Sequence, residues 1–116
     1  MLWVSQRDIR QVFNALDIVG RAARGELKHR LQGYDDHLGS RQRATVHEPR
    51  CTRSQMVLFT TPDDQPLALA HQYKRRDGSI GASGLPDPKK LFLGEHTLAY
   101  SPNQIPVPLP ARYRSH

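Results

Sequence analysis

Apolar residues recur at steps of three and four along the first third of the chain, and this spacing is the strongest structural signal in the sequence. The stripe consists of Ile9, Val12, Phe13, Leu16, Val19, Ala23, Leu27 and Leu31. Such a spacing places one apolar face on a helix. Ser5 with Asp8 is typical of a helix start, and Gly33 is a stop signal. The pattern predicts a helix over residues 6–32, which would kink or break at Gly20 or Gly25, each costing roughly 1 kcal/mol relative to alanine.

The second half of the chain has the short apolar runs and turn residues of an antiparallel sheet. Residues 34–54 are polar and predict a loop, and strands are expected at 55–61, 67–75, 90–93 and 97–101. A short, weak strand over 79–83 would be interrupted by Pro86-Asp87-Pro88. Asp77-Gly78 and Gly94-Glu95 are typical hairpin turns. Along 67–75 the alternation puts Leu67, Leu69, His71 and Tyr73 on one face and Ala68, Ala70, Gln72 and Lys74 on the other.

These elements predict an α+β fold, with one long or kinked N-terminal helix packed on a small antiparallel sheet of three to five strands. Residues 1–101 form a single domain in this interpretation, and 102–116 form an extended Pro-rich basic tail that contributes little to folding, with Leu109 and Tyr113 as its anchors. In the expected core, Ile9, Phe13, Leu16, Val19 and Leu27 pack on Val57, Phe59, Leu67, Leu69, Leu91, Phe92 and Leu98.

The charge of the chain points to an anionic partner. The 116 residues carry a formal net charge of +6, and the pI is about 10.0. Such a field attracts nucleic acid, an anionic membrane surface or an acidic protein. The sequence has no apolar run of membrane-spanning length, no signal-peptide core and a single cysteine. We therefore expect a cytoplasmic protein that does not enter a membrane.

Two groups of cations are candidates for contact with nucleic acid. On the predicted helix, Arg10, Arg21, Arg24 and Lys28 fall beside the apolar stripe, where they could follow a phosphate backbone. At the predicted hairpin tip stand Tyr73, Lys74, Arg75 and Arg76, and Lys89 and Lys90 follow across the next loop. For both groups the simpler alternative is a solvated surface that keeps the chain soluble.

Catalytic and metal-binding patterns are weaker. His71 or His96 could act as an acid or base, and in this alternative His71 works with Lys74, Arg75 and Arg76 as an endoribonuclease. His47 and Cys51 are four residues apart, but Pro49 lies between them and no second ligand pair follows. Gly78, Gly81 and Gly84 precede prolines rather than a helix, so they favour tight turns or close backbone approach over phosphate binding. We expect no cofactor and no bound metal.

The sequence therefore favours a small, non-enzymatic binding protein that contacts nucleic acid, or a complex that handles nucleic acid, through arginine and lysine surfaces. One alternative is the small, toxin-like endoribonuclease. Another is a phage-type inhibitor that occupies a nucleic-acid channel or an acidic protein surface. The helix-then-sheet order with a basic tip resembles small toxins and phage-encoded inhibitors of nucleic-acid machinery at the level of fold alone, so no residue role follows from that resemblance.

Overall fold

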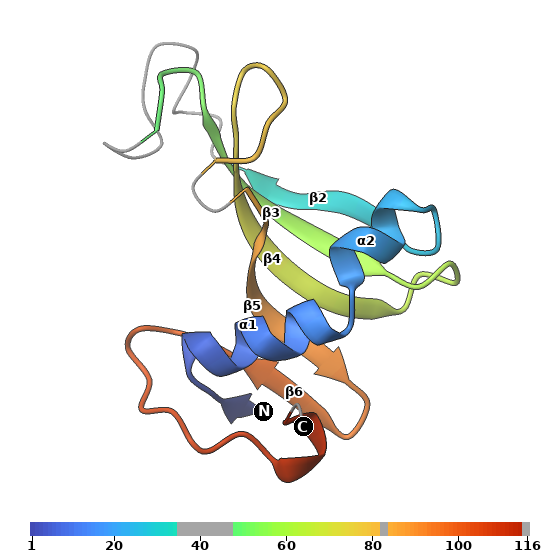
Figure 1. Ribbon diagram of the computed structural model, residues 1–116, viewed down its shortest axis with the longest axis vertical. Helices are drawn as coiled ribbons and strands as arrows, with labels where there is room; N and C mark the ends of the chain where they lie inside the picture. The colour runs from blue at the N-terminus through green and yellow to red at the C-terminus, as the bar shows by residue number, and fades with distance from the viewer. Residues whose placement is uncertain (35–47, 82–83, 115–116) are drawn as a thin grey trace.

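A six-stranded sheet with two short helices forms the molecule (Figure 1). The computed structural model describes residues 1–34, 48–81 and 84–114. The elements in chain order are β1 (Leu2–Trp3), α1 (Gln6–Ala15), α2 (Ile18–Ala23), β2 (Lys28–Tyr34), β3 (Arg53–Thr60), β4 (Pro66–Lys74), β5 (Asp87–Leu93), β6 (His96–Ala99) and a 3-10 turn at Ala111–Tyr113. Within the described ranges, no helix is long and apolar enough to cross a membrane.

The sheet has the strand order β1-β6-β5-β4-β3-β2. The strands from β2 to β6 pair antiparallel with their neighbours, whereas β1 pairs parallel with β6. The sheet is therefore mixed and has six strands, and the expected antiparallel sheet of three to five strands is wrong.

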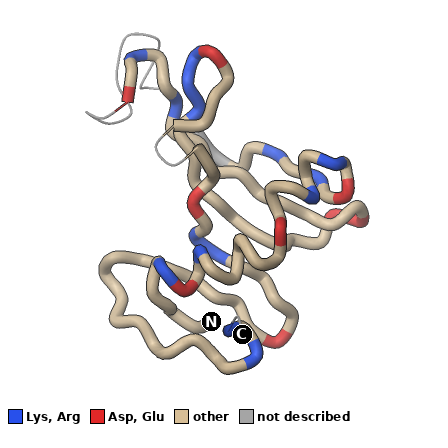
Figure 2. The backbone as a smooth tube through the Cα atoms, viewed as in Figure 1, with Lys and Arg blue, Asp and Glu red and all other residues tan. Residues whose placement is uncertain are grey.

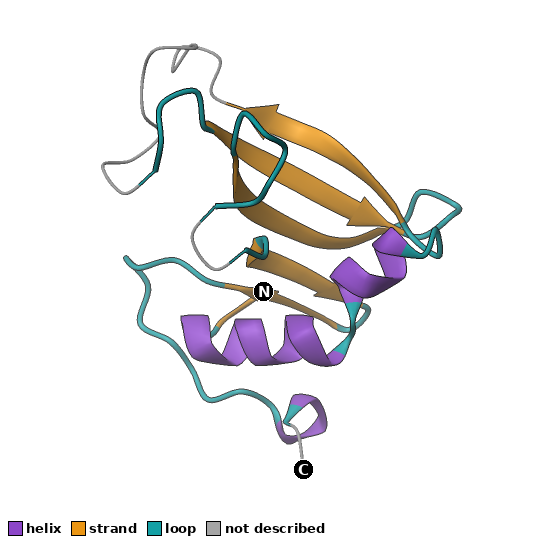
Figure 3. Ribbon diagram, turned by 45° about the horizontal axis from the view of Figure 1, so that its top comes forward, coloured by secondary structure: helices purple, strands orange, loops and turns teal. Residues whose placement is uncertain are grey.

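The predicted helix over 6–32 is wrong in its second half. Ser5 caps α1 as expected, since its hydroxyl accepts a hydrogen bond from the Asp8 N–H. The helix then stops because Asp17 adopts the left-handed conformation (φ 52°), and α2 leaves in a new direction (Figure 3). After the positive φ of Gly25, residues 28–34 extend along β3 as strand β2.

One face of the sheet carries the core, and both helices pack on it. Phe13 is 2% exposed and meets Phe59 edge to face at 6.2 Å between ring centroids, so its predicted burial is confirmed. Leu16 is only partly buried against the same cluster. On β4 the alternation is as predicted, but the small residues Ala68 and Ala70 are the ones fully buried in the core.

The predicted turns and hairpins are present. Gly78 and Gly94 both have positive φ in the turns that follow β4 and β5. Strand β5 begins at Asp87, before the expected start at Lys90, and therefore includes Pro88. This proline stands beside the register shift between Leu69 and Ala70 of β4, and such an irregularity is a place where a sheet tolerates proline.

The Pro-rich segment is attached to the domain more firmly than the sequence suggests. Leu109 is 4% exposed and belongs to the core cluster, and Tyr113 packs partly against it. The Val107 N–H donates to the Trp3 carbonyl at 2.8 Å. These contacts argue against the expected small contribution of residues 102–116 to folding.

Replacing Leu109 with alanine should therefore lower the free energy of unfolding by roughly 2–5 kcal/mol, as expected for loss of a buried leucine. Ile105, which is 91% exposed in the same segment, provides the matched control. Denaturant unfolding of Leu109→Ala and Ile105→Ala measures both. Equal stability of the two variants would contradict the packing of this segment.

Candidate nucleic-acid interface

Five lysine and arginine residues lie at one end of the sheet, where β3 begins and β4 ends. Figure 2 marks the backbone positions of lysine and arginine at this end in blue. We call this set the basic end; its members are Arg50, Arg53, Lys74, Arg75 and Arg76. Arg53 and Lys74 are directly opposite each other in the β3–β4 register. The turn after β4 carries two arginines, and Arg50 lies in the segment that leads into β3. Side chains from three parts of the chain therefore share one region.

An ion pair between the buried Glu48 carboxylate and the partly exposed Arg75 holds the two loops of the basic end together. Arg75 Nε donates to Glu48 Oε2 at 2.9 Å, and the Glu48 side chain is only 3% exposed. This hydrogen bond raises the pKa of Arg75. A Cβ atom at Gly81 would lie 2.2 Å from Glu48 Oε1, so the carboxylate occupies space that only a glycine leaves open. A carboxylate taken out of water requires such a cationic partner, which fixes the segment at Glu48 against the hairpin.

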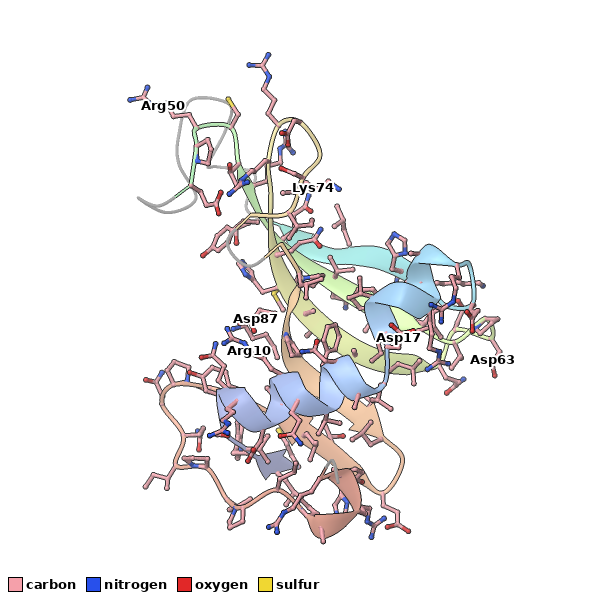
Figure 4. All side chains as sticks on the ribbon, viewed as in Figure 1. Arg10, Asp17, Arg50, Asp63, Lys74 and Asp87 are labelled. Carbon is pink, nitrogen blue, oxygen red and sulfur yellow. The ribbon has the colours of Figure 1, made fainter. Side chains whose placement is uncertain are left out.

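Three cations of the basic end have no carboxylate partner among the described residues. They are Arg50, Lys74 and Arg76, of which the first two are labelled in Figure 4. The nearby carboxylate of Asp77 accepts hydrogen bonds from the Ser79 hydroxyl and N–H at 2.6 and 2.9 Å, which lower the pKa of Asp77. The Asp77 carboxylate is therefore bonded to Ser79. Arg50, Lys74 and Arg76 are available to an external anion.

The cations expected on one helix face are spread over three elements. Arg10 lies on α1, Arg24 follows α2 and Lys28 begins β2, because the predicted helix ends early. The ion pairs are Arg10–Asp87, Arg24–Asp17 and Lys28–Asp64, at 2.8, 3.0 and 3.3 Å. Of the four candidates, only Arg21 has no ion pair among the described residues. The structure does not bring these side chains into one stripe.

Lys89 and Lys90 lie on β5 rather than beside the hairpin tip. Lys90 is opposite Leu69, five residues before Lys74 along β4. Lys89 donates to Asp87 at 3.1 Å, and its Nζ lies 5.5 Å from the centre of the Tyr100 ring. Burial alone would raise the pKa of Asp87, but hydrogen bonds from Arg10 and Lys89 outweigh it and lower that pKa.

His71 has different neighbours from those of the predicted catalytic set. Its Nε2 lies 2.6 Å from Ser54 Oγ, and its ring meets Tyr73 edge to face at 4.7 Å. Lys74 lies on the opposite face of β4 and lines a pocket there with Gln72. Burial, with the charge of Lys89 second, lowers the pKa of His71. The structure therefore places a neutral imidazole beside Ser54, with the whole sheet between it and Lys74.

The other histidine candidates have structural neighbours or lie outside the described residues. His96 Nδ1 is 3.0 Å from the Tyr113 hydroxyl, a contact between β6 and the C-terminal segment. His47, half of the considered His47–Cys51 pair, lies outside the described residues. Among residues that are described, no group of three or more His, Cys, Asp and Glu side chains is placed to hold a metal ion.

Sequence reasoning missed Glu48, and it named the loop 41–53, which carries Arg50 and Arg53, only as a reserve surface for nucleic-acid contact. Glu48 and Arg50 precede the apolar strand β3 and Arg53 is its first residue, in a polar stretch that has no periodicity. The two arginines just before the apolar run of the predicted strand were the one usable signal. The partner of Arg75 could not be chosen from spacing, because it lies 27 residues away.

The Glu48–Arg75 pair leads to a direct comparison of two adjacent arginines. Arg75→Ala should lower the free energy of unfolding, because the buried Glu48 carboxylate loses a charged hydrogen bond. Arg76→Ala makes the same change of charge at an exposed side chain, and its stability should match the wild type. Thermal or denaturant unfolding measures both, and equal stability of the two variants would rule out the structural role of the pair.

The lowered pKa of His71 predicts how stability responds to acid. The unfolded state binds a proton near the ordinary histidine pKa of about 6.5, whereas the folded state takes it up at lower pH. The contribution of neutral His71 is therefore fully present above about pH 6.5 and is lost as the pH falls below it. His71→Gln should lose less stability than the wild type between about pH 7.5 and 5.5. Urea unfolding of both proteins across this pH range measures the difference. If their free energies of unfolding fall in parallel with pH, His71 does not contribute to the acid response.

Comparison of the chain with protein-family models, with curated proteins and with solved structures gives no significant match in any of the three.

Proposed function

We propose that this protein is a small, non-enzymatic binding protein that contacts nucleic acid, or a complex that handles nucleic acid, through the basic end. The observation that carries the proposal is the gathering of Arg50, Arg53, Lys74, Arg75 and Arg76 at one end of the sheet. The ion pair of Arg75 with the buried Glu48 carboxylate positions their loops before any ligand arrives. A ligand that neutralises these charges therefore does not need to order the backbone that presents them.

Phosphate is the group that best suits this arrangement. Guanidinium groups bind phosphate oxygens through several N–H donors at once, and lysine adds a compact charge. Contacts to successive phosphates release bound counterions, so affinity falls steeply with salt. Tyr73 is the one aromatic residue beside these cations in sequence, and its ring contacts His71 on β4. Phosphate contacts rather than base stacking on Tyr73 should dominate at the basic end.

The second candidate function is a small endoribonuclease, and one observation favours it. Neutral His71 forms a 2.6 Å hydrogen bond with Ser54 and lies near Lys89, so it could accept a proton from a ribose hydroxyl. Lys74, Arg75 and Arg76 would not assist it from the hairpin, because Lys74 lies across the sheet. Cleavage of excess RNA that disappears in His71→Ala would support this function over simple binding.

Binding measured by fluorescence anisotropy tests the proposal. Labelled RNA and DNA oligonucleotides are titrated at two salt concentrations with the wild type and with the double variant Arg50→Glu/Arg76→Glu. The wild type should bind at low salt. The variant should bind at least about tenfold more weakly, and the slope of its salt dependence should fall by roughly 0.7 for each phosphate that it no longer neutralises.

Arg7→Glu/Arg21→Glu is the matched control. It makes the same change of net charge at two arginines of the helices that have no ion pair among the described residues. Equal weakening by both double variants would show only a response to net charge and would refute the basic end. Absence of binding at low salt would refute direct nucleic-acid contact and favour the inhibitor of an acidic protein surface.

A further inference from the structure

An open pocket of about 580 Å³ lies on the core face of the sheet, between α2, strands β2 to β4 and the segment after the hairpin. Its apolar walls include Val19, Ala22, Val57, Ile80 and Pro86. Leu31 of β2 also lines it and remains 49% exposed. No carboxylate is among the described residues that line it. The volume of the pocket falls in the range of sites that bind small organic groups. Its lining includes Arg30 and Lys74, so it favours an anionic ligand or one attached to an anion.

A pair of glutamine amides gives the pocket a polar element. Gln55 of β3 and Gln72 of β4 are directly opposite each other, and Gln72 Nε2 donates to Gln55 Oε1 at 3.0 Å. The remaining amide groups, Gln55 Nε2 and Gln72 Oε1, form no hydrogen bond with any described residue. One donor and one acceptor on a pocket wall match the edge of a nucleobase, which presents both. A purely aliphatic ligand would leave these amides unsatisfied.

The pocket is also lined by an aromatic ring, His29, and by a cation, Lys74. His29 of β2 lines the pocket and is exposed, and its ring lies 6.1 Å from that of Phe59. Histidine rings are among the platforms on which unpaired bases stack. Lys74 lines the pocket and is also a member of the basic end, so the two surfaces are continuous. A strand whose phosphates lie on the basic end therefore passes the mouth of the pocket.

We propose that this pocket accepts one unpaired base of a single-stranded nucleic acid, with His29 stacking on the base and the amides of Gln55 and Gln72 contacting its edge. The proposal rests on the proposed function, because the basic end supplies the phosphate contacts. It adds selectivity: a base inside a duplex is stacked and paired, so it must first be extruded at an energetic cost. The protein therefore prefers single strands to duplexes of the same sequence.

The test compares a labelled single-stranded oligonucleotide with an abasic strand of the same length and with the corresponding duplex, by anisotropy on the full chain. Wild-type protein should bind the base-bearing strand roughly 5- to 10-fold more tightly than either of the others. Gln72→Leu and His29→Ala should each remove most of this preference. Gln65→Leu, at an exposed glutamine in the turn before β4, should retain it.

The outcomes separate this inference from the proposed function. Equal binding of base-bearing and abasic strands, both weakened by Arg50→Glu/Arg76→Glu, would overturn the base pocket and leave the basic end intact. A preference that survives Gln72→Leu and His29→Ala would also overturn the pocket. If none of the three probes binds, the proposed function itself is overturned. The abasic comparison uses the unaltered protein, so it does not depend on the folding of a variant.

Discussion

Asp17 holds the backbone in the left-handed conformation between α1 and α2, and the arrangement of the core face depends on this turn. Its carboxylate lies where a Cβ atom of Gly20 would stand and bonds to Arg24 at 3.0 Å. Aspartate tolerates this conformation better than most residues. The turn ends α1 after ten residues, and α2, which follows it, has six. Two short helices leave part of the face formed by β2, β3 and β4 uncovered, and the pocket occupies that part.

The buried Glu48 carboxylate fixes the loops of the basic end through its ion pair with Arg75. Arginines clustered on mobile loops would repel one another and spread apart, because like charges a few ångströms apart interact unfavourably. Here one buried acid binds Arg75 from within and so reduces the repulsion inside the cluster. The pair separates roles between adjacent residues: Arg75 stabilises the loop, and Arg76 remains exposed to solvent. An acidic residue is thus part of the reason that a basic surface is ordered.

The sequence predicted the strands better than the helices, and particular residues show why. Along β4, strict alternation between two turn signals specified the strand, its faces and the hairpin at Asp77-Gly78. Along 19–31, Leu27 and Leu31 satisfy a helical spacing, but residues four apart also lie on the same face of a strand. Pairing with β3 decides in favour of the strand, and a local sequence pattern carries no information about that pairing. The hairpin cations were found from their turn, whereas the Glu48–Arg75 pair and the pocket depend on contacts distant in sequence.

The attachment of β1 and of the Pro-rich segment to the same edge has a consequence for how the domain forms. β1 pairs with β6 through Leu2–Leu98 and Trp3–Ala99, and Val107 then donates to Trp3. The backbone groups of β1 therefore have no partners until residues about a hundred positions later are in place. Contacts of such long sequence separation carry a large loop-closure entropy and slow the search for the native state. During synthesis, the hairpins from β3 to β6 can assemble first, and closure of the β1 edge completes folding only after residue 107 has emerged.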